Sequence, residues 1–130
     1  MRFFNDSKAT SVDATIKALE AFADERGKIV LIIGGLGKQA PYSPLRSLVR
    51  NRVRKLILIG EDAPAIEREL GSEASFDHAK TMGAAVAQAF AAAQPGDIVL
   101  LAPACASFDM FESFEHRGRV FKEEVLGLRS

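Results

Sequence analysis

Cysteine is almost absent from this sequence, since Cys105 is the only one among 130 residues. A disulfide within the chain is therefore excluded, and a lone thiol suits a reducing compartment, so we expect a cytoplasmic protein. Long apolar runs are also missing: none approaches the ~18 residues that a membrane span needs. The first residues, Met1 to Asn5, lack the apolar segment of a signal peptide. We expect no membrane association.

An excess of charge of one sign is missing as well, because 17 Lys and Arg balance 17 Asp and Glu. The chain has no Trp and one Tyr, and the local basic cluster is not interleaved with aromatic residues, so we expect no nucleic-acid partner. The cluster is more simply a solvated helix face; it comprises Arg46, Arg50, Arg52, Arg54 and Lys55. Only two His are present and no Cys/His cluster has metal spacing, so no metal site is predicted.

Apolar runs of strand length alternate with segments of helical periodicity. This alternation predicts an α/β fold, Rossmann-like, with a mostly parallel sheet and helices on both faces, in one domain over residues 1–130. The opening strand follows Met1 at once, which suggests a domain cut from a longer chain or one that docks by its terminus. The predicted strands are 2–5, 28–33, 55–59 and 98–101, with a short edge strand at 74–76. The predicted helices are 12–25 (capped by Thr10 or Ser11 and ended by Gly27), 43–52, 62–70, 77–93 and 110–126.

Polar loops follow three of these strands. They are Asn5 to Ser11, Gly34 to Lys38 and Pro103 to Asp109. Ligands of open α/β sheets bind outside the carboxyl ends of the strands, so we expect these loops to form the functional site. In the first loop, Asp6 can accept hydrogen bonds from ribose hydroxyls and Lys8 can pair with phosphate; plain helix capping is the alternative.

The glycine loop is not a phosphate-binding Walker A loop. Its spacing would need Gly at position 32 and Ser or Thr at position 39, where the chain has Ile32 and Gln39. Gly35 to Ala40 matches G-x-G-x-x-A, but the prolines at 41 and 44 prevent a helix from starting at the third position. Two interpretations stay open: a tight turn with a solvated Lys38, or a loop that presents this ammonium to a ligand.

A hydrolase would need Ser107 or Cys105 as a nucleophile and a histidine as the base. Neither His78 nor His116 is predicted on a strand-end loop, and no G-x-S-x-G elbow surrounds Ser107. We therefore predict no catalytic residue in this domain alone, and interpret Cys105 as a small buried hydrophobe.

Six segments together resemble the C-terminal domain of the Mur ligases of peptidoglycan synthesis, in the branch that adds D-glutamate. They span nearly the whole chain in the right order: Asn5–Thr10 (N-D-S-K-A-T), Gly34–Lys38 (G-G-L-G-K), Tyr42–Leu45 (Y-S-P-L), Pro95–Asp97 (P-G-D), Pro103–Asp109 (P-A-C-A-S-F-D) and Phe111–Gly118 (F-E-S-F-E-H-R-G). The resemblance implies a Rossmann-like third domain of an ATP-dependent ligase that joins D-glutamate to UDP-N-acetylmuramoyl-L-alanine. It also implies that ATP and Mg²⁺ are held mainly by a central domain, and the UDP-sugar by a first domain, neither of which is in this sequence.

By this resemblance Asp6 would hold the ATP ribose and Lys8 would face the phosphates or the acyl phosphate. The D-glutamate carboxylates would be bound by Thr10, Lys38, Ser107 and the backbone around Phe108 and Phe114. Ser11, Gly37 and Ser113 depart from the residues usual in the family. The alternative is a stand-alone nucleotide- or amino-acid-binding module with the same fold, since fold does not fix function.

Overall fold

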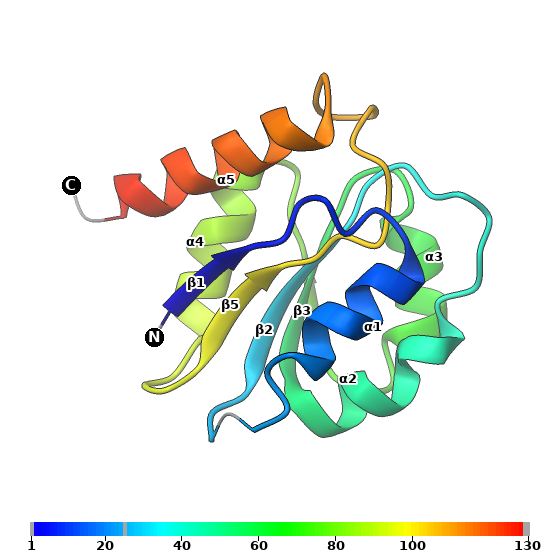
Figure 1. Cartoon of the computed structure of the whole chain (residues 1–130), viewed down its shortest axis with the longest axis vertical. Coiled ribbons are helices and arrows are strands. Elements are labelled where there is room, and N and C mark those ends of the chain that lie inside the picture. The colour runs from blue at the N-terminus through cyan, green and yellow to red at the C-terminus, as the bar shows by residue number, and fades with distance from the viewer. Residues whose placement is uncertain (1, 25, 129–130) are drawn as a thin grey trace.

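A computed structural model describes residues 2–24 and 26–128 of the chain (Figure 1). Five strands form one sheet in the order β1-β5-β2-β3-β4, and every neighbouring pair is parallel. The strands are β1 (Arg2–Asn5), β2 (Ile29–Gly34), β3 (Val53–Ile59), β4 (Ser75–His78) and β5 (Ile98–Leu101). The helices are α1 (Val12–Glu20), the 3₁₀ turn η1 (Ser43–Leu45), α2 (Arg46–Arg52), α3 (Ala63–Leu70), α4 (Met82–Ala92) and α5 (Phe114–Gly127). The predicted parallel α/β sheet is confirmed.

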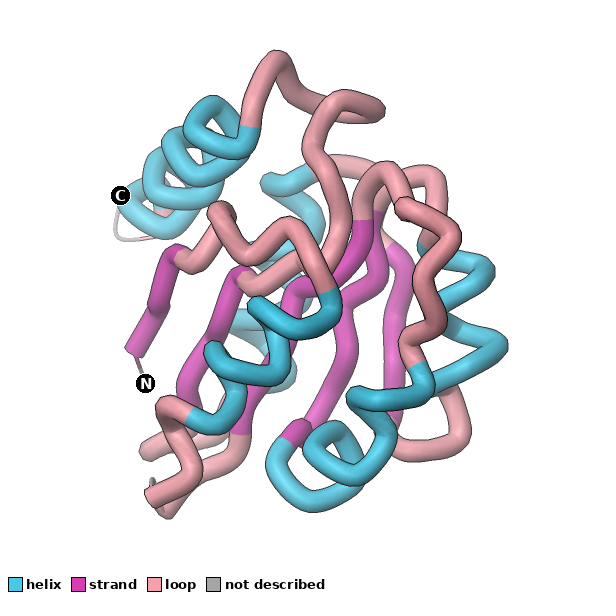
Figure 2. The backbone as a smooth tube through the Cα atoms, turned by 45° about the vertical axis from the view of Figure 1, so that its right-hand side comes forward, coloured by secondary structure: helices cyan, strands magenta, loops and turns pink. Residues whose placement is uncertain are grey.

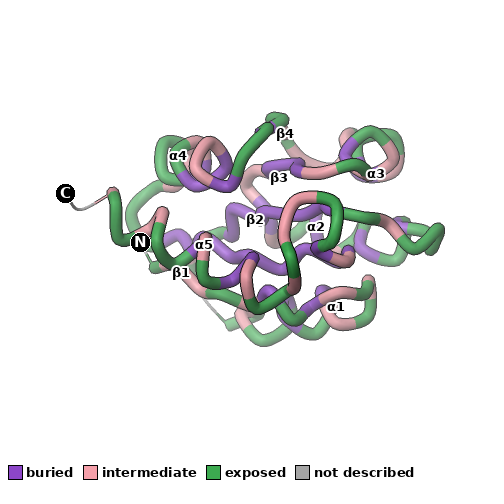
Figure 3. The backbone as a smooth tube through the Cα atoms, turned by 90° about the horizontal axis from the view of Figure 1, so that it is seen from above, coloured by how far each residue is buried: buried purple, intermediate pink, exposed green. Residues whose placement is uncertain are grey.

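The central strand β2 is buried on both faces. All six of its residues are covered, because β5 and β3 pair with it on either side and helices lie above and below. A strand in this position carries a continuous apolar run instead of alternating apolar and polar residues, and Ile29 to Ile33 is such a run. Figure 3 shows the buried strand layer between α1 on one side and α4 on the other.

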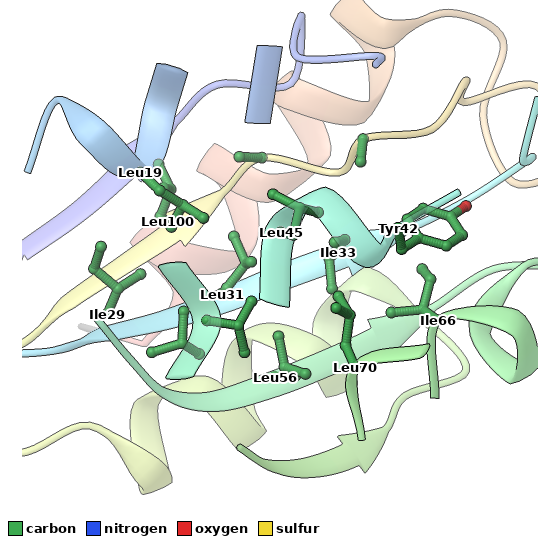
Figure 4. Close-up of a cluster of buried hydrophobic side chains, with 14 of the residues drawn as sticks. Leu19, Ile29, Leu31, Ile33, Tyr42, Leu45, Leu56, Ile66, Leu70 and Leu100 are labelled. Atoms are coloured by element: carbon green, nitrogen blue, oxygen red, sulfur yellow. The ribbon is translucent and has the colours of Figure 1, made fainter. Parts of the chain in front are cut away.

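Two separate hydrophobic cores fill the two faces of the sheet. On one face, α1, α2 and α3 contribute Leu19, Val49, Ile66 and Leu70 to a cluster with the odd-numbered residues of β2 (Figure 4). On the other face, α4 and α5 contribute Met82, Val86 and Phe121 to a cluster with Val30 and Ile32. The prediction of helices on both faces is thus confirmed. No helix among the described residues is long and apolar enough to cross a membrane.

Three helix boundaries differ from the predicted ones by four residues or more. Helix α1 ends at Glu20, and Gly27 lies beyond it. Helix α4 begins at Met82, because residues 77 and 78 still pair with β3 and the Thr81 hydroxyl accepts the Ala84 N–H as the cap.

The same capping shortens the last helix. The Ser113 hydroxyl accepts the His116 N–H, so α5 begins at Phe114, and residues 110–113 form the end of a turn and a bend. Cap residues favour an extended backbone and so separate a helix from the polar loop before it.

Candidate functional site

The three polar loops lie together at the carboxyl edge of the sheet (Figure 2) and are joined by backbone hydrogen bonds. Leu36 in the glycine loop exchanges two bonds with Ala106 in the loop after β5, with N···O distances of 2.9 and 3.0 Å. The Ala104 N–H donates to the carbonyl of Ala9, in the loop after β1, at 2.9 Å. The loop after β5 is therefore fastened to both of its neighbours, and the three loops form one surface.

Glycines are required where the glycine loop approaches its neighbours. Gly34 and Gly35 have φ of 132° and 138°, and a Cβ on Gly34 would lie 1.9 Å from the carbonyl oxygen of Ile59. A helical element begins only at Ser43, so the loop lacks the helix that a dinucleotide fingerprint needs. Gly34 and Gly35 are therefore needed because their backbone packs closely against neighbouring backbone, not because they bind a dinucleotide.

Arg117 is the buried anchor of this edge, with 1% of its surface exposed. Its Nε donates to the Ser7 hydroxyl at 2.8 Å and its Nη2 to the Ser7 carbonyl at 2.6 Å. Its Nη1 donates to the Cys105 carbonyl at 2.9 Å. Burial lowers the pKa of Arg117 to about 10, which leaves it charged at neutral pH. One side chain on α5 thus holds two loops in a fixed relation.

The neighbouring Gly118 allows this close approach. A Cβ there would lie 2.8 Å from Nδ2 of Asn5 and 3.3 Å from Cβ of Ser7. The Ser7 hydroxyl also donates to the Phe114 carbonyl at 2.7 Å. The first turns of α5 and the loop after β1 are therefore in direct contact.

Cys105 and Tyr42 form a second buried group, with the half-buried Asp62 beside them. The Tyr42 hydroxyl donates to the Asp62 carboxylate and lies 3.1 Å from Sγ of Cys105. Burial is the largest cause that raises the pKa of Cys105, to about 11, and burial also raises the pKa of Tyr42. A neutral thiol with no exposed surface is a poor nucleophile, which supports its interpretation as a packed core residue.

The seven predicted site residues differ in how far they reach solvent. Lys8 and Lys38 are exposed, Asp6 and Thr10 are half-buried, and Phe108 is 69% exposed. Ser107, in contrast, is 2% exposed, and its carbonyl accepts the N–H groups of Met110 and Phe111. Phe114 begins α5 and is 39% exposed. All seven lie at the carboxyl edge, on the three loops or at the start of α5.

A pocket of about 300 Å³ opens where β1 ends against the first turns of α5, and we call it the β1–α5 pocket. Its lining residues are Asn5, Ser7, Lys8, Phe114, Glu115, Gly118, Arg119 and Lys122. Two predicted site residues, Lys8 and Phe114, are among them. Arg119 and Lys122 carry no signal in the sequence, because exposed cations on a helix are common.

The two histidines lie on different elements, His78 on β4 and His116 on α5. His78 is the last residue of β4 and lies in the strand itself, whereas the helix predicted over 77–93 would have contained it. Its Nε2 lies 2.6 Å from the Glu67 carboxylate. Nδ1 of His116 accepts the Glu112 N–H at 3.1 Å, and the imidazole ring of His116 packs edge-on against the Phe111 ring. Within residues 2–24 and 26–128, no group of three or more His, Cys, Asp or Glu is arranged to hold a metal ion.

The basic cluster at residues 46–55 is engaged with its neighbours. Arg50 pairs with Glu73 at 2.8 Å, Arg54 with Asp97 at 2.6 Å and Lys55 with Asp77 at 2.7 Å. Arg46 donates to the Glu69 carbonyl at 2.9 Å. Arg46, Arg50 and Arg52 lie on α2, as expected for a helix face, but Arg54 and Lys55 lie on β3 and are half-buried, so the prediction of one solvated helix face is wrong for these two residues.

Comparison with known proteins decides the family. Residues 1–105 match the family described as "Mur ligase, glutamate ligase domain". The chain belongs to this Mur ligase family. It is 52% identical over 122 residues to a protein of Anaeromyxobacter dehalogenans, covering 94% of this chain and 26% of that protein. It is 50% identical over 127 residues to one of Coxiella burnetii, covering 97% of this chain and 29% of that protein.

A protein of Salinibacter ruber is 53% identical over 125 residues, covering 95% of this chain and 26% of that protein. All three relatives are named UDP-N-acetylmuramoylalanine–D-glutamate ligase. This Mur ligase chain spans between a quarter and three-tenths of their length. The resemblance inferred from the six sequence segments is confirmed.

Proposed function

We propose that this chain is the D-glutamate-binding, C-terminal domain of a cytoplasmic, ATP-dependent ligase that joins D-glutamate to UDP-N-acetylmuramoyl-L-alanine in peptidoglycan synthesis. The names of the relatives support this assignment. The observation that carries it is that the three loops of the family motifs are hydrogen-bonded into one surface at the carboxyl edge of the sheet. The remainder of the ligase would supply Mg²⁺ binding, most of the ATP site and the UDP-sugar site.

D-Glutamate carries two carboxylates, which need cations and hydrogen-bond donors. Leu36 pairs with Ala106 across the two loops. Lys38 offers an exposed ammonium two residues after Leu36, and Ser107 directly follows Ala106. Thr10 follows Ala9, which is bonded to the same loop. We infer that Thr10, Lys38, Ser107 and the backbone near Phe108 and Phe114 bind the two carboxylates.

Asp6 and Lys8 lie in the loop after β1, which also carries Thr10, and the loop after β5 lies between this loop and Lys38. A carboxylate suits ribose hydroxyls and repels glutamate, so we assign Asp6 to the ATP ribose. We assign Lys8 to the phosphates. The domain would then act by orientation, since holding the amine of D-glutamate against an ATP-activated carboxyl group lowers the entropic part of the barrier.

The proposal can be tested in a chimaera in which this chain replaces the corresponding 127-residue segment of the Coxiella burnetii ligase, to which it is 50% identical. We expect ADP release that requires both D-glutamate and UDP-N-acetylmuramoyl-L-alanine. The matched control is the same ligase truncated before the segment, which should be inactive. A correctly folded chimaera that hydrolyses ATP without any response to D-glutamate would contradict the proposal and favour a stand-alone binding module.

A further inference from the structure

Asp62 occupies the N-cap position of α3 but does not cap the helix. Aspartate is among the residues preferred at this position, because its carboxylate can accept a backbone N–H of the first turn. The Asp62 side chain accepts none of the N–H groups of α3, a helix described throughout, and accepts the Tyr42 hydroxyl instead. Asp62 therefore makes a contact with the segment between β2 and η1 in place of a capping bond.

Asp62 contacts this segment, residues 35–42, at three places. The Asp62 N–H donates to the Gly35 carbonyl at 2.9 Å. The carboxylate lies against Gly37, where a Cβ would be 2.9 Å from Oδ1 and closer still to Oδ2. The same carboxylate accepts the Tyr42 hydroxyl. One residue at the start of α3 thus holds the start, the middle and the end of the segment.

Lys38 lies in a part of the segment that has no hydrogen bonds of its own. Within the described part of the chain, residues 38–41 make no hydrogen bond, and all of them are exposed. Gln39, directly after Lys38, has a φ of 63°. Residues other than glycine keep this left-handed conformation only where their surroundings enforce it. The position of Lys38 is therefore set by the fixed points on either side of it, Gly37 and Tyr42.

Tyr42 is held by more than its hydroxyl. Its side chain lies in the same hydrophobic cluster as Ile66 (Figure 4), with 3% of its surface exposed. Its backbone N–H donates to Oε1 of Glu69 at 3.0 Å. The ring and the N–H would hold residue 42 in place without the hydroxyl. The particular contribution of the hydroxyl is to hold the Asp62 carboxylate against Gly37.

We propose that Tyr42 and Asp62 are positioning residues for the ligation reaction, and that their hydrogen bond holds Lys38 in one position relative to D-glutamate. Without the Tyr42 hydroxyl, the Asp62 carboxylate can turn to cap α3, and Gly37 then loses the group that packs against it. Lys38 would stay charged and exposed but would no longer be held in one place. The inference rests on the proposed function, in that Lys38 is there assigned to D-glutamate.

The first test is Tyr42→Phe in the Coxiella burnetii chimaera, since this change removes the hydroxyl and keeps the buried ring. We expect KM for D-glutamate to rise about five- to twentyfold, with kcat and KM for ATP changed by less than about twofold. The free energy of unfolding should change little, because the Asp62 carboxylate gains a capping bond.

The control is Asp97→Asn, which weakens the bonds of Asp97 to Arg54 at the opposite edge of the sheet, where β5 begins. It should lower the stability more than Tyr42→Phe does and leave KM for D-glutamate unchanged. Lost stability and lost positioning are thereby separated. An unchanged KM for D-glutamate in Tyr42→Phe, or an equal rise in Asp97→Asn, overturns the inference.

A double-mutant cycle tests whether the hydroxyl acts through Lys38. In the Lys38→Ala background, Tyr42→Phe should raise KM for D-glutamate by less than about twofold, because the cation to be positioned is gone. A rise as large as that in the unmodified chimaera would show that Tyr42 acts by another route, and the inference would be wrong.

A measurement on the 130-residue chain separates this inference from the proposed ligase function. The backbone NMR order parameters of Lys38, Gln39 and Ala40 should fall from about 0.85, typical of rigid backbone, to below about 0.6 in Tyr42→Phe. Equal order parameters in the two chains overturn the inference alone. A chimaera without D-glutamate response, made from a chain whose order parameters fall as expected, overturns the proposed function and leaves the contact that holds the segment standing.

Discussion

Replacing Arg117 by Lys should destabilise the chain although charge is conserved. The guanidinium is 1% exposed and makes three hydrogen bonds, to the hydroxyl and carbonyl of Ser7 and to the carbonyl of Cys105. An ammonium lacks the planar fork and cannot reach all three acceptors, and it is more strongly hydrated, so its burial costs more. Losing one or two charge-assisted bonds in a buried site costs about 2–4 kcal/mol.

That loss can be measured as a shift of the unfolding transition. For a domain of this length, about 3 kcal/mol corresponds to a melting temperature lowered by roughly 11 °C. Urea and thermal unfolding followed by circular dichroism give both quantities. The matched control is Arg119→Lys, two residues further along the same helix but exposed, which should change stability by less than about 0.5 kcal/mol. If Arg117→Lys were as mild as this control, the anchoring role of Arg117 would be wrong.

Three further predictions concern other groups. Burial alone would raise the pKa of Asp97, but Arg54 and the N–H groups of Gln94 and Lys28 hold it below the ordinary 3.8. The ionised Asp97 carboxylate therefore stabilises the fold above about pH 4, and this stabilisation is lost as the pH falls through the lowered pKa. The Asp97→Asn variant should accordingly lose less free energy of unfolding on acid titration than the unmodified chain does. Because burial raises the pKa of Cys105 to about 11, a disulfide reagent at pH 8 should label the thiol only on unfolding, and prompt labelling of folded chain would refute this. D-Glutamate should bind the isolated chain only in the millimolar range, since exposed ion pairs contribute about 1 kcal/mol or less; micromolar affinity by calorimetry would contradict it.

The strands and their parallel arrangement could be predicted because the burial of β2 and β5 on both faces leaves continuous apolar runs in the sequence. The gathering of three loops at one edge followed from the parallel arrangement and was confirmed. The ends of the helices were less predictable. Thr81 and Ser113 act as caps inside segments whose apolar periodicity had already begun, so periodicity alone placed α4 and α5 too early.

The interior of the site had no signal in the sequence. Arginine is rarely buried, and the contact of Arg117 with Ser7 joins residues 110 positions apart. The Tyr42–Asp62 bond likewise joins residues 20 positions apart, and it depends on how the segment before η1 packs against the start of α3. Such contacts follow from tertiary structure, whereas strands, loops and motifs can be read locally. The assignment of Lys38 and Asp6 to different substrates stays a prediction.

We propose that Lys38 contacts D-glutamate and that Asp6, across the loop after β5, contacts ATP. The most direct test is steady-state kinetics of the chimaera with each substrate varied separately. Lys38→Ala should lower kcat/KM for D-glutamate about ten- to a hundredfold, corresponding to roughly 1.5–3 kcal/mol for a charge-assisted contact, and affect ATP little. Asp6→Ala should act mainly through ATP. A Lys38→Ala variant that raises KM for ATP and leaves KM for D-glutamate unchanged would contradict the assignment.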